Sequence, residues 1–112
     1  MSDTSPWVDI PAEMKHVHDF SDTTSLDNGH THDYMGYVSF GVAYGDSHIH
    51  WYCNVTTVAQ GHSHTYYGWT GPSQPRGNSH IHFLSGMVCP AQGHIHTYFT
   101  GTSPAEPPPG VP

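Results

Sequence analysis

Short stretches of alternating apolar and polar residues run through the middle of the chain, separated by turns rich in glycine. Residues 48–53 and 94–99 carry the β-branched and aromatic side chains that favour strands. Asn28-Gly29 has the signal of a two-residue hairpin turn, and residues 59–61 and 91–93 stand at equivalent places. The sequence contains no long helix-forming run. This pattern predicts an all-β fold built from short hairpins.

A 32-residue unit occurs three times along the chain. All twelve histidines fall in His-x-His pairs, and the first members of successive pairs step alternately by 14 and 18 residues. Because an internal repeat constrains the whole fold, we expect one β domain of three units over residues 16–47, 48–79 and 80–103. An N-terminal extension (1–15) and a proline-rich tail (104–112) flank it. The histidines are His16, His18, His30, His32, His48, His50, His62, His64, His80, His82, His94 and His96.

Each histidine pair is predicted to bind metal. Side chains two residues apart on a strand share a face, so the two imidazoles of a pair lie about 6.6 Å apart and can reach one ion. Histidines that merely decorate a polar strand face would not fall so regularly into pairs. In an up-and-down meander, the first pairs of the three units gather at one end and the second pairs at the other.

Two arrangements of the pairs are open. Packing of the three units around a pseudo-threefold axis brings six imidazoles together at each end, which suits octahedral iron(II), nickel or cobalt. That arrangement predicts about two ions per chain, most simply iron(II). A hairpin turn near Val55-Thr56 would instead place both pairs of one unit side by side, giving a four-histidine site that favours zinc. The glycine positions favour the first arrangement.

The composition narrows the possible partners. Apolar residues make up only 35% of the chain, so its core is thin, and small domains of this kind often need metals or oligomerisation to fold. Lys15 and Arg76 are the only lysine and arginine, and the formal net charge is −7. Two such cations cannot build a phosphate-binding surface, so nucleic acid is not an expected partner.

Neither a secretory signal nor a membrane span is expected. The first residues lack a basic start followed by an apolar run, and no stretch approaches the roughly 18 apolar residues of a span. Localisation stays open: cytoplasmic by default, and surface or extracellular if the protein belongs to an appendage.

Four further residues are candidates for the sites. Asp19 and Asp33 directly follow the two pairs of the first unit and could accept imidazole N–H groups. Adjacent strand residues face opposite ways, however, so we expect both to face solvent. Cys53 and Cys89 could form a disulfide, share a metal or remain free, and buried free thiols are the commonest case.

The aromatic residues and the tail have simpler interpretations. Tyrosines and tryptophans that follow the pairs could be redox-active near a metal, but aromatic residues on strands usually pack. They are Tyr34, Tyr66, Tyr98, Trp51 and Trp69. Residues 104–110 have the composition of a polyproline helix, which would form an extended end or lie along a neighbouring subunit.

The sequence does not predict an enzyme. Catalytic metal sites keep an open coordination position with an acid or base nearby, whereas six-histidine sites are saturated. The only glutamates, Glu13 and Glu106, lie outside residues 16–96, the stretch that contains all the histidine pairs. Neither a nucleophile elbow nor a phosphate loop occurs in the sequence.

Thr70-Gly71-Pro72, residues 77–83 and residues 93–98 resemble the YmaF family of small bacterial proteins with repeated His-x-His hairpins. The resemblance covers roughly residues 16–103 and supports the repeat without implying an activity. The pairs also resemble, more loosely, the iron-binding strands of phage receptor-binding fibre tips, in which three chains each contribute one pair to an octahedral iron. This second resemblance implies that all twelve histidines are ligands. It leaves open whether three units fold together in one chain or three chains form a needle with six stacked ions.

The leading hypothesis is a structural metalloprotein, in which transition ions replace the missing core and hold the fold or assembly together. A metal-buffering or storage protein with separate, exposed pairs is the first alternative, and a redox metalloprotein is another. A subunit of a metal-stabilised fibre or surface appendage is the last, because low charge and unprotected strand edges favour self-association as a trimer or filament.

Overall fold

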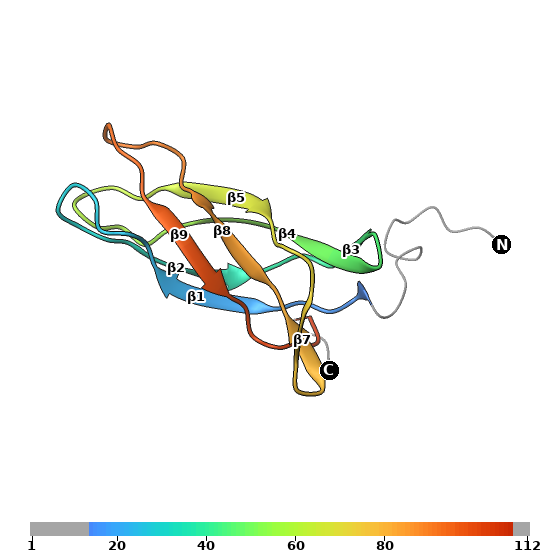
Figure 1. Cartoon of the computed structure of the whole chain (residues 1–112). Coiled ribbons are helices and arrows are strands. Elements are labelled where there is room, and N and C mark those ends of the chain that lie inside the picture. The colour runs from blue at the N-terminus through green and yellow to red at the C-terminus, as the bar shows by residue number, and fades with distance from the viewer. Residues whose placement is uncertain (1–13, 109–112) are drawn as a thin grey trace.

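The computed structural model describes residues 14–108, which contain nine β-strands (Figure 1). The prediction of an all-β fold is confirmed. Within these residues no helix is long and apolar enough to cross a membrane. The strands are β1 (Asp19–Thr23), β2 (Asp33–Tyr37), β3 (Gly41–Tyr44), β4 (Ser47–Val55), β5 (Thr65–Trp69), β6 (Gln74–Arg76), β7 (Ser79–Ile81), β8 (Phe83–Met87) and β9 (Thr97–Gly101).

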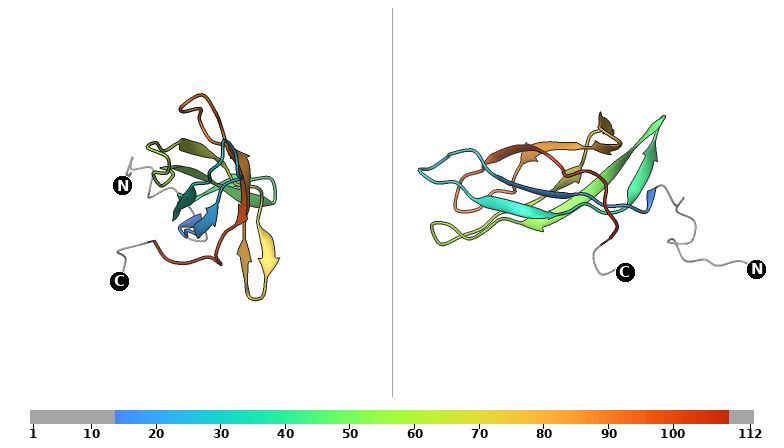
Figure 2. Two further views of the ribbon diagram at one scale, coloured as in Figure 1. Left: turned by 90° about the vertical axis from the view of Figure 1, so that its left-hand side faces the viewer. Right: turned by 90° about the horizontal axis from the view of Figure 1, so that it is seen from below.

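Three long antiparallel hairpins form the body of the molecule: β1 with β2, β4 with β5, and β8 with β9. Phe20, Tyr52 and Leu84, spaced by 32 residues, hold the same register position in the three hairpins. Shorter hairpins, β3 with β4 and β6 with β7, extend from the opposite end. The three long loops, which join β1 to β2, β4 to β5 and β8 to β9, therefore lie together at one end of the molecule (left in Figure 1). Figure 2 shows the same elongated arrangement from two further sides.

The turns of the long loops are those that the sequence predicts. Asn28 and Gly29 have φ angles of 54° and 78°, as a type I′ turn requires. Gln60 and Gln92 also have φ of 54°, which is uncommon for a residue other than glycine or asparagine. The strand expected over residues 94–99 begins later, at Thr97, because His94 exchanges two hydrogen bonds with Ala91 to close the turn.

Equivalent residues of the three units make equivalent hydrogen bonds to a neighbouring unit. Near the loops at residues 24–32, 56–64 and 88–96, the amides of residues 25, 57 and 89 donate to the preceding hairpin, the first unit donating to the third. Near the short hairpins, the amides of residues 39, 71 and 103 donate to the following hairpin, the third unit donating to the first. The pairs are Ser25 to Thr97, Thr57 to Asp33, Cys89 to Thr65, Ser39 to Trp51, Gly71 to Phe83 and Ser103 to Asp19, with N···O distances of 2.7 to 2.9 Å. Each unit thus contacts both others within one chain. These contacts support the predicted pseudo-threefold axis, which itself stays a prediction.

The two ends of the described chain pair with each other. Val17 and Glu106 exchange two backbone hydrogen bonds of 2.9 Å. In the other units the same register position is held by Val42 opposite Ile49 and by Gln74 opposite Ile81, inside tight hairpins. The C-terminal residues therefore supply the strand partner that the first unit lacks. The two interpretations of the proline-rich tail stay predictions, and residues 109–112 and residues 1–13 of the expected N-terminal extension lie outside the described residues.

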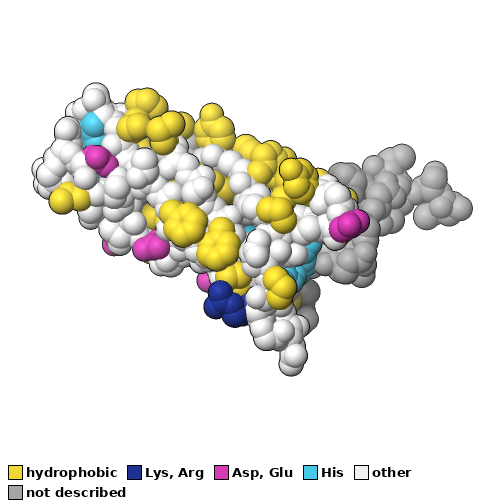
Figure 3. All heavy atoms as spheres, viewed as in Figure 1, with side chains coloured by type: hydrophobic (Ala, Val, Ile, Leu, Met, Phe, Trp, Pro, Cys, Tyr) yellow, Lys and Arg dark blue, Asp and Glu magenta, His cyan; other side chains and the backbone are white. Residues whose placement is uncertain are grey.

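A small aromatic core separates the two ends of the molecule. The rings of Tyr34, Tyr66 and Tyr98 are buried with centroids 5.6 Å apart, so their expected packing role is confirmed. The cluster comprises Phe20, Tyr34, Val38, Tyr52, Tyr66, Leu84, Val88 and Tyr98. Trp51 and Trp69 lie outside it on the outer face, 36% and 50% exposed. Other hydrophobic side chains are also exposed, as the face in Figure 3 shows, so little apolar surface is left to hold the fold.

Candidate metal centres

All twelve histidines gather in two clusters, one at each end of the aromatic core. Site 1 contains His16, His18, His48, His50, His80 and His82. Site 2 contains His30, His32, His62, His64, His94 and His96. In each site, six ring nitrogens, one from each histidine, lie within 4.8 Å of one another. Every unit contributes one pair to each site, so the four-histidine arrangement is wrong. The turns fall at the glycines rather than near Val55-Thr56, which sends the two pairs of a unit to opposite ends.

The spacing of the ligand atoms fits an octahedron. In site 1 the Nε2 atoms of His16, His48 and His80 lie 3.1 to 3.2 Å apart. In site 2 the Nε2 atom of His94 lies 3.2 Å from those of His30 and His62. Octahedral edges of this length put a central ion about 2.2 Å from each nitrogen, close to the usual length of about 2.0–2.1 Å for a histidine–metal bond.

The second histidine of each pair, here called the inner histidine, has its tautomer fixed by the backbone. All six inner histidines are at most 1% exposed, and their Nδ1 atoms lie 2.7 to 3.0 Å from carbonyl oxygens. A carbonyl only accepts, so Nδ1 carries the hydrogen and Nε2 keeps a bare lone pair. The pairs are His18 with Ser103, His32 with Thr57, His50 with Ser39, His64 with Cys89, His82 with Gly71 and His96 with Ser25.

The bare lone pairs are buried and point together. Among the described residues, five inner Nε2 atoms have no hydrogen-bond partner, those of His18, His32, His50, His64 and His96. A buried acceptor without a donor costs about 1–3 kcal/mol, and converging lone pairs also repel one another. A bound cation removes both costs at once. Histidine ligands commonly donate their other N–H to a carbonyl in this way, so the residues present fit a transition-metal ion.

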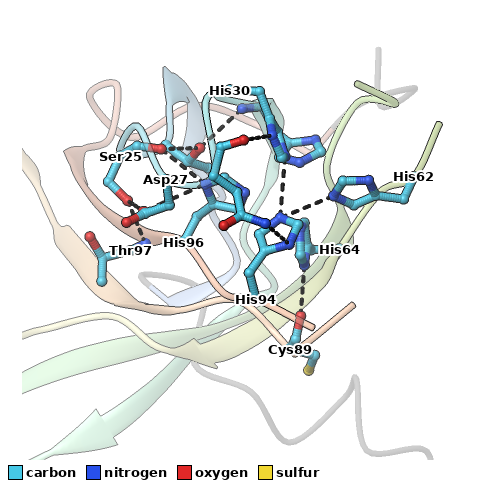
Figure 4. A network of polar contacts seen from close by, with 12 residues as sticks. Ser25, Asp27, His30, His62, His64, Cys89, His94, His96 and Thr97 are labelled. Atoms are coloured by element: carbon cyan, nitrogen blue, oxygen red, sulfur yellow. Dashed lines mark hydrogen bonds and ion pairs between the residues drawn. The ribbon is translucent and has the colours of Figure 1, made fainter. Parts of the chain in front are cut away.

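A backbone carbonyl also faces the Nδ1 atom of the first histidine in each site 2 pair. The Nδ1 atoms of His30, His62 and His94 lie 3.2 Å from the carbonyl oxygens of Asn28, Gln60 and Gln92, respectively. These carbonyls belong to the positive-φ residues of the type I′ turns. Each turn therefore reverses the chain and also orients a ligand, as Figure 4 shows for His30 and its neighbours.

Threonine side chains brace the inner histidines. Thr24 and Thr56 accept the amides of His32 and His64 at 3.0 Å, and two further threonines act in the same way in site 1. There Thr70 accepts from His50 and Thr102 from His82 at 3.1 Å. Valine stands at the two remaining equivalent positions, 38 and 88. These threonines are not among the site residues predicted from the sequence, although threonine recurs with the 32-residue period at positions 24 and 56 and at positions 70 and 102.

Burial favours the neutral histidines that metal binding requires. Desolvation lowers the pKa of His18 and of His48 to about 4. It lowers the pKa of His50 and of His82 to about 3. In site 2 it also lowers the pKa of His32. These imidazoles are therefore neutral at pH 7, with lone pairs free for a metal.

The remaining candidates lie outside the two ligand sets. Asp33 is exposed, as expected, and accepts a hydrogen bond from Thr23. Asp19 is half-buried beside Glu106, where the chain ends meet. Cys53 and Cys89 are free, but the expectation that both are buried is wrong. Cys53 is exposed because it follows the inward-facing Tyr52, and Cys89 is half-buried.

Comparison with known proteins identifies one family. No curated protein and no solved structure matches the chain significantly. The sequence profile of the YmaF family, described as spore germination protein GerY/YamF, matches residues 13–103. These residues include both histidine clusters and most of the described fold. Because the match covers more than half of the sequence, the chain belongs to the YmaF family.

Proposed function

We propose that this protein is a structural metalloprotein that binds two octahedral transition-metal ions, one in each six-histidine site. The single observation that carries the proposal is the convergence of buried, unpartnered Nε2 lone pairs at both ends of the molecule. The two ions would act where a larger protein has apolar packing, because the core cluster of residues 14–108 contains eight residues.

The donor set guides the choice of metal. Six imidazole nitrogens in an octahedron suit iron(II), nickel or cobalt, and iron(II) is the ion we propose. Zinc prefers four ligands in structural sites. The six histidines would fill all six positions around such an ion and would leave no place for a substrate. We therefore propose a role in holding the fold together rather than catalysis.

Metal buffering by separate pairs is less well supported. A buffer requires pairs that fill independently and remain accessible, whereas each site here combines pairs from all three units and buries its inner histidines. The description of the family as a spore germination protein supports spores as the setting in which the metal-stabilised domain acts.

The proposal is tested by removing metal from protein purified without an affinity tag. Chelation at pH 7.5 should release two ions per chain and lower the thermal unfolding midpoint by well over 10 °C, because binding to the native state alone stabilises it by mass action. Readdition of iron(II) should restore the midpoint. Thr31→Ala, which changes a residue between two ligands of site 2, should bind both ions normally. An unfolding midpoint that is unchanged after complete metal removal would sink the proposal.

A further inference from the structure

The three units differ at site 2 where the first unit meets the third. In the first loop, Asp27 and Asn28 lie beside the histidine pair of the third unit. Ala59-Gln60 and Ala91-Gln92 hold these positions in two loops, whereas the first loop has Asp27-Asn28. The Oδ2 atom of Asp27 lies 3.6 Å from Nδ1 of His96. Ser25 donates a hydrogen bond to the same oxygen (Figure 4).

We propose that Asp27 is a specificity-determining residue of site 2, where its carboxylate favours a more highly charged ion, iron(III) over iron(II), relative to site 1. This inference rests on the proposed function, since it concerns the metal that the site would hold. Asp27 does not touch the ion and acts through His96.

The Asp27 carboxylate is not needed to hold the His96 imidazole in its orientation. Nδ1 of His96 already donates to the carbonyl of Ser25 at 3.0 Å, as the other inner histidines donate to their own carbonyls. Asp27 therefore adds negative charge on the side of the imidazole that faces away from the ion. A carboxylate in this position increases the basicity of the imidazole. Its attraction to the ion grows with the charge of the ion, so it favours the oxidised state.

The carboxylate is not needed to form the loop either. The loops with alanine in place of Asp27 form the same turn, with φ of 54° at Gln60 and Gln92 and of 54° at Asn28. The bridge that closes the first loop, between Asp27 and His30, also has equivalents in both other loops. Loop geometry therefore gives no reason for an acid at this one position.

The size of the effect is limited by exposure. The Asp27 side chain is 46% exposed, so water and salt screen its charge. Replacement of a carboxylate that supports a histidine ligand typically changes metal affinity by 10- to 100-fold. For a half-exposed carboxylate we expect the low end of this range, about tenfold in the ratio of ferric to ferrous affinity.

The test is a redox titration of the full-length protein loaded with iron. Asp27→Asn should raise the potential of one of the two irons by about 59 mV, the equivalent of tenfold for a one-electron couple, and leave the other unchanged. The half of the titration curve that belongs to the site 2 iron should therefore shift to higher potential, and the other half should stay in place. Ala59→Asp and Ala91→Asp, which place a carboxylate at the equivalent positions, should each move the same half to lower potential.

Asp33→Asn is the matched control. It also removes one negative charge from a residue next to a ligand of site 2, but the Asp33 side chain accepts a hydrogen bond from Thr23 and, within residues 14–108, none from a histidine. Its shift should be less than a third of that of Asp27→Asn. An equal shift in both variants, or no shift in Asp27→Asn while two irons remain bound, would overturn the role of Asp27 alone. Failure of the unaltered protein to bind iron at either site would instead contradict the proposed function, and with it this inference.

Discussion

The two histidine sites have the same ligand set but are assembled differently. In site 2 every pair follows a two-residue turn inside a continuous hairpin loop, and the loop itself supplies a carbonyl to the first histidine of the pair. In site 1 two pairs lie on hairpins closed by tight turns, but the third, His16 and His18, is held by the other end of the chain.

The clasp, defined here as Val17, Asp19, Ser103 and Glu106, holds the His16–His18 pair in place. Ser103 accepts the Nδ1–H of His18 at 2.8 Å and the amide of Asp19 at 3.0 Å. The His16–His18 pair of site 1 is therefore positioned only when residues more than 80 positions apart meet, whereas each pair of site 2 follows a turn of its own loop. An ion in site 1 should accordingly join the chain ends, whereas an ion in site 2 should join three preformed loops.

Removal of one inner ligand should have the largest effect. His50→Ala in site 1 and His64→Ala in site 2 should each reduce the metal content from two ions to about one per chain and lower the free energy of unfolding by several kcal/mol. Elemental analysis with chemical denaturation measures both quantities. Loss of both ions from either variant would show that the two sites fill together and are not separately assembled.

Acid should be the next strongest perturbation of the metal-free protein, and it should act mainly through site 1. The pKa values of His18 and His48 are lowered to about 4 and those of His50 and His82 to about 3, whereas an unfolded chain protonates its histidines near pH 6.5. The stability of the folded state is thus fully present above pH 6.5 and is lost as pH falls through about 4. Urea denaturation between pH 8 and pH 4 measures this dependence, and a flat profile below pH 6.5 would contradict it.

A change in the clasp should separate the sites. Glu106→Pro removes the N–H that donates to Val17, so site 1 should lose about tenfold in affinity while site 2 is unaffected. Glu106→Gln keeps this N–H and should bind both ions nearly as well as the unaltered protein. Competition with a chromogenic chelator measures the two affinities. Equal weakening of both sites by Glu106→Pro would argue against the clasp.

The threonine brace should give the smallest effect. Thr56→Val leaves the buried amide of His64 without its acceptor, which should cost about 1 kcal/mol of stability. Val88→Thr provides a hydroxyl at the equivalent position of the third unit and should be neutral or slightly stabilising. Thermal denaturation of the metal-loaded variants checks both. Equal destabilisation by the two substitutions would point to packing rather than to the hydrogen bond.

Local signals explain why much of the site could be predicted from the sequence. The two-residue period of His-x-His, together with Asn28-Gly29 and its equivalents, determines which way the imidazoles point and where the chain reverses. These features are sufficient to separate first pairs from second pairs. The sequence therefore predicts which six histidines gather at each end of the fold, and the structure has the same two sets.

Contacts between distant or unlike residues could not be predicted in the same way. Val17 and Glu106 lie 89 positions apart, and the proline-rich composition around Glu106 is typical of a tail rather than of a strand partner. The half-buried position of Asp19 follows from the same contact. The roles of Thr56 and its equivalents depend on three-dimensional packing, because a hydroxyl eight residues before a histidine has no local reason to accept its amide.

Native mass spectrometry of tag-free, metal-loaded protein is the decisive experiment for metal binding within one chain. We expect a single chain that carries two ions, because each site takes its six histidines from the three units of one chain. Both ions should remain bound when any larger assembly is diluted into monomers. Three ions per chain, or ions that are lost whenever an assembly dissociates into single chains, would contradict it.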